Sequence, residues 1–161
     1  MLAERFRRWF DYEVDAHAKT IASLESVPAE KQSGSDFKKA VTVFAHLVAA
    51  RRVWLFRLGI AEAPKGSLFP ENPSLAEVVG NWREAEALWK NYLAALTDAD
   101  VAKVFEYQAL DGGRFRNTIE EVLTQLFGHS SYHRGQIAML VKSAGGKPAI
   151  TDFIYWCREA I

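Results

Sequence analysis

The segment from residue 119 to residue 144 constrains the fold of this chain more than any other. Its apolar residues recur at steps of three and four, as they do on one face of an α-helix. Two histidines, His129 and His133, interrupt that apolar face. Side chains at positions i and i+4 of a helix project from the same face, so the two imidazoles can converge on one metal ion. The apolar positions are Ile119, Val122, Leu126, Ile137, Leu140 and Ala144.

The spacing alone leaves two interpretations of the histidine pair open. A neutral imidazole in an apolar core needs a hydrogen-bond partner, and a divalent metal ion would satisfy both rings at once. However, a core histidine is more often hydrogen-bonded than bound to a metal, and a bare His-x-x-x-His pair is a weak motif.

Composition limits the classes of function that the chain can have. Its 161 residues suffice for one domain, 1–161, with a substantial core. The 20 basic and 20 acidic residues balance, which argues against a nucleic-acid partner. No run approaches the ~18 apolar residues of a membrane span, and the N-terminus lacks the apolar stretch of a signal peptide. The single cysteine, Cys157, fits a reducing compartment, so we expect a cytoplasmic protein with no membrane partner.

Helical periodicity predicts four long helices and one long connection. Ser35 or Asp36 is the expected N-cap of the second helix, and Ser74 with Glu77 forms a capping-box pattern at the start of the third. The loop of about fourteen residues at 60–73 is rich in Pro and Gly, and its length suggests that it crosses the bundle. The four helices are expected at about 2–26, 35–59, 74–96 and 118–144.

Two smaller elements complete the expected architecture. Extended residues on either side of Asp111 and Gly112 suggest a β-hairpin before the fourth helix. Pro148 separates the fourth helix from a short terminal helix that begins at Thr151 or Asp152. The predicted fold is all-α, a four-helix bundle with long crossover connections, a small β-hairpin before the fourth helix and a short C-terminal helix.

A metal ion held by His129 and His133 needs a further ligand, and His46 in the second helix is the natural third. Three histidines leave a coordination position open, which is typical of catalytic sites and accommodates zinc, nickel, iron(II) or cobalt. Ser130 stands where a His-Glu-x-x-His metalloprotease would carry its glutamate, so that class is excluded. No Glu-x-x-His occurs either, which disfavours a carboxylate-bridged di-iron site.

At these residues the chain resembles the DinB/YfiT-like family. The family pattern is a histidine in the second helix, then His-x-x-x-His-Arg-Gly-Gln in the fourth, then a glycine, a proline and an aspartate. Here the pattern is matched by His46, by residues 129–136, by Gly145 and Pro148, and by Asp152. The resemblance covers nearly the whole chain and implies a three-histidine metal site, with zinc or nickel as the expected ion.

The chain departs from the family pattern in its first helix. Where the family usually has tryptophan and asparagine, this chain has Asp15 and His17. His17 is a candidate for lining the site or for a fourth ligand, and the alternative is a partly exposed histidine with no role. Gln136 is a second candidate for lining the site. Arg134 is expected to face away from it, in a salt bridge or capping a loop carbonyl.

The resemblance implies a metal-dependent enzyme that activates water or a thiol, of the hydrolase or thiol S-transferase and isomerase type. The expected partner is an unidentified small-molecule substrate, with a low-molecular-weight thiol as one candidate. The alternative is a non-catalytic metal-binding or stress-response protein with a structural or vestigial site. We also expect a homodimer, because relatives often pair through helix faces and because a small bundle does not readily bury Trp9, Trp82, Trp89 and Trp156.

Overall fold

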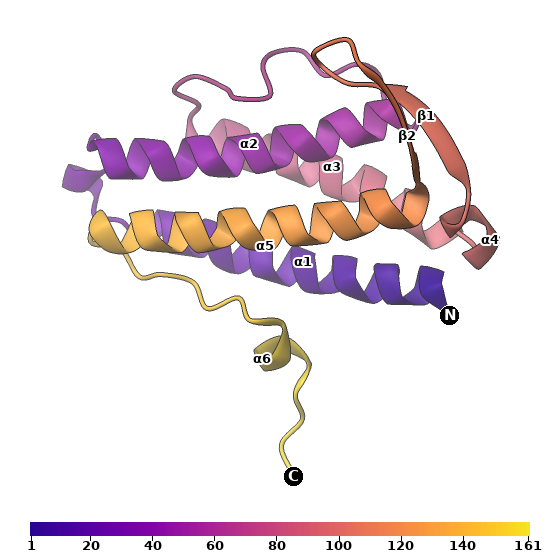
Figure 1. The fold of residues 1–161 in the computed structure, drawn as a ribbon. Coiled ribbons are helices and arrows are strands. Elements are labelled where there is room, and N and C mark those ends of the chain that lie inside the picture. The colour runs from indigo at the N-terminus through magenta and orange to yellow at the C-terminus, as the bar shows by residue number, and fades with distance from the viewer.

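The computed structural model describes all residues from Met1 to Ile161 and shows a bundle of four long helices (Figure 1). The all-α prediction is therefore confirmed, together with the hairpin and the short terminal helix. The second helix begins at Ser35, so its N-cap is Gly34 and not Ser35 or Asp36 as expected. The long helices are α1 (Leu2–Glu25), α2 (Ser35–Arg57), α3 (Leu75–Ala95) and α5 (Ile119–Ser143).

The helices form a four-sided bundle in which α2 and α5 share the most extensive contact. Helix α1 also packs on α5 and α3, and α2 also packs on α3. Helices α2 and α3 run in the same direction, so the connection at residues 58–74 runs back along α2 before α3 begins (Figure 1). The expected crossover of this loop is confirmed.

The end of the bundle near the start of α5 carries the β-hairpin. Strands β1 (Val104–Gln108) and β2 (Arg114–Thr118) are antiparallel. Gly112 adopts φ +88° at the tip, a conformation that favours glycine. Thr118 ends the hairpin and starts α5 by a capping box, because it accepts from the Glu121 N–H while Glu121 accepts from the Thr118 N–H.

Three short helices complete the fold. The 3₁₀-helix η1 (Ala29–Lys31) and α4 (Asp98–Val101) were not expected from the sequence, because a single turn has no periodicity to detect. Helix α6 (Phe153–Cys157) lies outside the four long helices, below α1 in the view of Figure 1.

The bundle core holds more aromatic surface than the sequence argument allowed. Trp89 is fully buried and Trp82 nearly so, which contradicts the expectation that a small bundle does not readily accommodate such residues. Trp9 is partly buried and stacks on Phe127 with ring centroids 4.4 Å apart. None of the helices is long and apolar enough to cross a membrane.

Candidate metal centre

Three imidazoles from two helices meet between α2 and α5. His46 comes from the middle of α2, and His129 and His133 occupy successive turns of α5. The Nε2 atom of His129 lies 3.3 Å from Nε2 of His46 and 3.0 Å from Nε2 of His133. All three ligand atoms fall within 4.8 Å of one another, so this group can hold one metal ion.

The hydrogen bonds of the outer ring nitrogens determine which nitrogen carries the proton. His46 Nδ1 lies 2.9 Å from the Leu68 carbonyl oxygen, and His133 Nδ1 lies 2.8 Å from Oε1 of Gln136. Both oxygens accept, so both Nδ1 atoms donate and the two Nε2 atoms carry lone pairs in the neutral rings. A proton on His129 Nε2 can satisfy only one of these lone pairs. A cation between the rings satisfies all three nitrogens.

The environment also favours neutral imidazoles. Burial is the main cause that lowers the pKa of His129 to about 4, and the imidazoles of His133 and His46 and the guanidinium of Arg51 lower it further. Burial likewise lowers the pKa of His46, against the opposing effect of its bond to the Leu68 carbonyl. Both rings therefore present lone pairs at neutral pH, which is the protonation state that a metal ion requires.

The crossover loop and the hairpin tip enclose a cavity beside the histidines. Phe69 of the loop stacks on His46, with ring centroids 4.3 Å apart and planes inclined by 3°. The cavity has a volume of about 160 Å³. It reaches from the histidines past Leu68 to Leu110 at the hairpin tip. The remaining lining residues come from α2 and α5 and are Ala50, Val53, Trp54, Arg57, Gln125 and Leu126.

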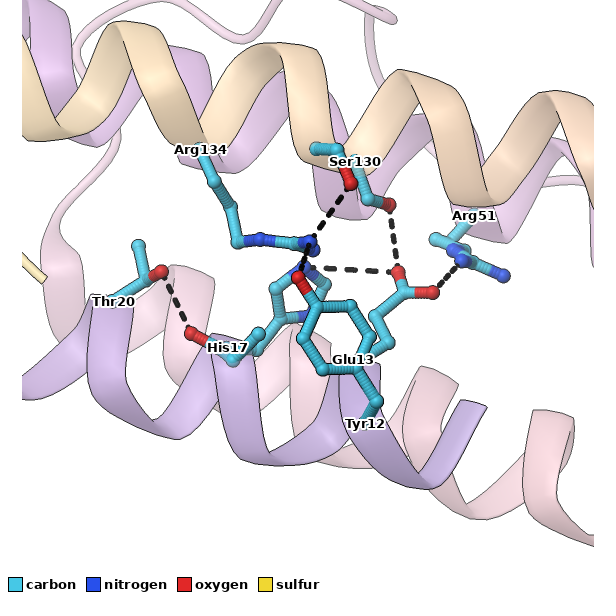
Figure 2. A network of polar contacts seen from close by, with 9 residues as sticks. Tyr12, Glu13, His17, Thr20, Arg51, Ser130 and Arg134 are labelled. Carbon is cyan, nitrogen blue, oxygen red and sulfur yellow. Dashed lines mark hydrogen bonds and ion pairs between the residues drawn. The ribbon is translucent and has the colours of Figure 1, made fainter. Parts of the chain in front are cut away.

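A buried polar network lies on the other side of α5, between α5, α1 and α2 (Figure 2). Glu13 of α1 is its only carboxylate, and it accepts from Ser130 at 2.7 Å and from Arg51. Sequence reasoning missed this network. The sequence did contain one indication of it: Glu13 lies three residues after Phe10 and four before His17, on the buried face of the first helix.

His17 belongs to this network and not to the histidine group. It is fully buried, which contradicts the alternative of a partly exposed residue. Its Nε2 lies 3.7 Å from Oε1 of Glu13, and its ring packs edge-on against Trp82. It is neither in the group of three ligands nor among the residues that line the cavity. Burial, followed by the charges of Arg134 and Arg51, lowers the pKa of His17 well below its ordinary value.

Arg134 faces away from the three histidines, but the salt bridge or carbonyl cap expected for it is wrong. Its guanidinium donates to the Tyr12 hydroxyl at 2.9 Å and to the Ser131 hydroxyl at 3.0 Å (Figure 2), and it forms no ion pair with a carboxylate. The Tyr12 hydroxyl in turn donates to the Thr151 carbonyl. This chain of bonds connects α5 through α1 to the segment that precedes α6.

Acidification is expected to destabilise the metal-free protein. The pKa of His129 is about 4 in the fold and about 6.5 in an unfolded chain, so the unfolded state binds protons more readily between these values. Stability should therefore decline as the pH falls from 6.5 towards 4. Urea unfolding with a chelator present should show this decline, and His129→Gln should make it shallower. An unchanged midpoint between pH 7 and pH 5 would contradict the lowered pKa.

Comparisons with known proteins agree with the motif. The model of the DinB family matches residues 1–159. Protein DinB of Bacillus subtilis (strain 168) is 26% identical over 158 residues, which cover 89% of this chain and 88% of that protein. No solved structure matches the chain.

Proposed function

This chain belongs to the DinB family, and we propose that it is a divalent-metal-dependent enzyme acting on a small molecule. His46, His129 and His133 are its proposed metal ligands. The proposed reaction is of the hydrolase type or of the thiol S-transferase and isomerase type, with a low-molecular-weight thiol as the candidate co-substrate. The cytoplasm is the proposed location, because a reducing compartment keeps such thiols reduced.

The observation that carries this proposal is the convergence of three Nε2 atoms, two of which, on His46 and His133, have their ring protons held on the opposite nitrogen. The Leu68 carbonyl and the Gln136 amide hold protons on Nδ1 of His46 and His133, so the lone pairs on Nε2 face inward. Such outer hydrogen bonds are typical of metal-binding histidines, where they fix both the ring orientation and the tautomer. A purely structural role would not require the unprotonated Nε2 atoms of His46 and His133 to face the imidazole of His129.

The donor set suits zinc or nickel, since imidazole nitrogens bind both. When bound, such an ion lowers the pKa of a water or thiol that coordinates it. Three neutral ligands leave the full charge of the ion uncompensated, which favours an anionic further ligand. Within the chain, Leu68 and Phe69 position His46 at the cavity, and the apolar residues of the cavity wall limit the access of water.

The purified protein is expected to contain close to one divalent ion per chain. His133→Ala should lose most of that metal, because it removes one of three donors. Gln136→Ala should retain the ion with about 10–100-fold weaker affinity, because it removes the outer hydrogen bond of His133. Elemental analysis of protein made without a histidine tag, with competitive chelator titration, measures both effects.

Lys142→Ala is a suitable control for this experiment, because Lys142 lies on the exposed part of the same helix. It should bind metal as the unmodified protein does. If the variant that lacks all three histidines retained the same metal content, the assignment of the ligands would be wrong.

A site of catalytic form should accept a thiol on the metal. Adding a small thiol to cobalt(II)-substituted protein should produce a sulfur-to-cobalt charge-transfer band, because sulfur would enter the open coordination position. An unchanged absorption spectrum would favour the alternative of a non-catalytic metal-binding or stress-response protein.

We also propose a two-fold homodimer, now on different grounds from the tryptophan argument. Exposed apolar side chains lie on α5 at Tyr132 and Met139, and on α6 at Ile154 and Tyr155. Aromatic side chains and methionine are enriched at protein–protein interfaces. Light scattering at micromolar concentration should give twice the chain mass of 18.1 kDa, and Tyr132→Glu with Met139→Glu should give the monomer mass. A monomer mass for the unmodified protein would contradict the proposal.

A further inference from the structure

Arg57, in the last turn of α2, is held in place by aromatic rings and has no acidic partner. Its guanidinium carbon lies 4.7 Å from the ring centroid of Trp54 and 4.9 Å from that of Tyr107. The Arg57 guanidinium makes no hydrogen bond and no ion pair within the chain. By contrast, Arg51 is paired with Glu13, and Arg52 bonds to Asn81. Stacking fixes the plane of a guanidinium but leaves its N–H donors free.

Arg57 lines the same cavity as two of the metal-ligand histidines. His46, His129 and Arg57 all contribute to the cavity of about 160 Å³, and none of its lining residues is acidic. The Arg57 guanidinium is partly buried, which leaves its charge less hydrated than in bulk water and lowers its pKa. A cation in such an environment attracts an anion more strongly than one in bulk water does. A divalent ion at the histidines would add to the positive potential.

We propose that this cavity binds a small organic anion whose carboxylate pairs with Arg57 while its other end reaches the histidine group. The inference rests on the proposed function and specifies its substrate class. A guanidinium binds carboxylates and phosphates through two parallel hydrogen bonds. The carboxylate is the smaller of these, and it suits a cavity below the roughly 300–1,000 Å³ of sites for drug-sized ligands.

Two thiols of matched size test the role of the carboxylate. Cobalt(II)-loaded protein is titrated at fixed ionic strength with 3-mercaptopropionate and with neutral 3-mercapto-1-propanol, and the charge-transfer band gives each dissociation constant. The carboxylate thiol should bind roughly tenfold more tightly, which corresponds to about 1.4 kcal/mol. Arg57→Gln should abolish this preference and leave the affinity for the neutral thiol unchanged.

Arg52→Gln is the matched control, because Arg52 lies on the same helix and already bonds to Asn81 and Glu84. This variant should keep the preference for the carboxylate thiol. Metal analysis of both variants should give the same content as the unmodified protein. Equal affinity of the unmodified protein for the two thiols would overturn the proposal, as would a preference that survives in Arg57→Gln.

A metal-free measurement separates this inference from the proposed function. In protein treated with a chelator, 3-mercaptopropionate should shift the NMR resonance of the Arg57 Nε–H group, and 3-mercapto-1-propanol should leave it in place. If the protein bound no metal but showed this shift, the metal-dependent function would fail and the anion site would stand. If metal bound normally and both thiols left the resonance unmoved, the anion site alone would fail.

Discussion

The positions of the three histidines depend on one buried carboxylate, that of Glu13. It accepts from Arg51 on α2 and from Ser130 on α5, and so connects three helices at one level of the bundle (Figure 2). Ser130 directly follows His129, and Arg51 follows His46 by five residues. If α2 slid along α5, a buried charge would be left without its partner, at a cost of about 3–5 kcal/mol. The pairing of Glu13 therefore fixes the register that brings His46 to His129.

Helix α5 presents two different chemistries because consecutive residues differ by about 100° around a helix. His129 and His133 face α2, and His129 also lines the cavity, while Ser130 and Arg134, each one residue later, face α1. The histidine group and the network around Glu13 are electrostatically linked, because the guanidinium of Arg51 contributes to the lowered pKa of His129. The positive charge of Arg51, which belongs to the buried network, thus favours the neutral form of the His129 imidazole.

The fold and the grouping of the three histidines were accessible from the sequence, because periodicity assigns residues to helix faces and the family motif indicates which faces meet. The network around Glu13 was not. A helical pattern identifies the buried face that carries Glu13 and His17, but it does not show which groups from other helices will oppose them. Arg134 illustrates the same limit, since its partner Tyr12 is 122 residues away. The tryptophan argument for a dimer failed because Trp82 and Trp89 pack into the core between helices, which composition alone does not show.

The hydrogen bond from His46 to the Leu68 carbonyl follows from the topology of the bundle. Helices α2 and α3 are adjacent and run in the same direction, and Arg52 bonds to Asn81. Helix α3 therefore begins about level with the middle of α2, and the chain must return about 18 Å along that helix. That path needs at least about five extended residues, which rules out a tight turn. The returning chain lies along α2, where a loop without internal secondary structure exposes its carbonyl groups. The connection that the helix order requires thereby supplies the acceptor that orients His46.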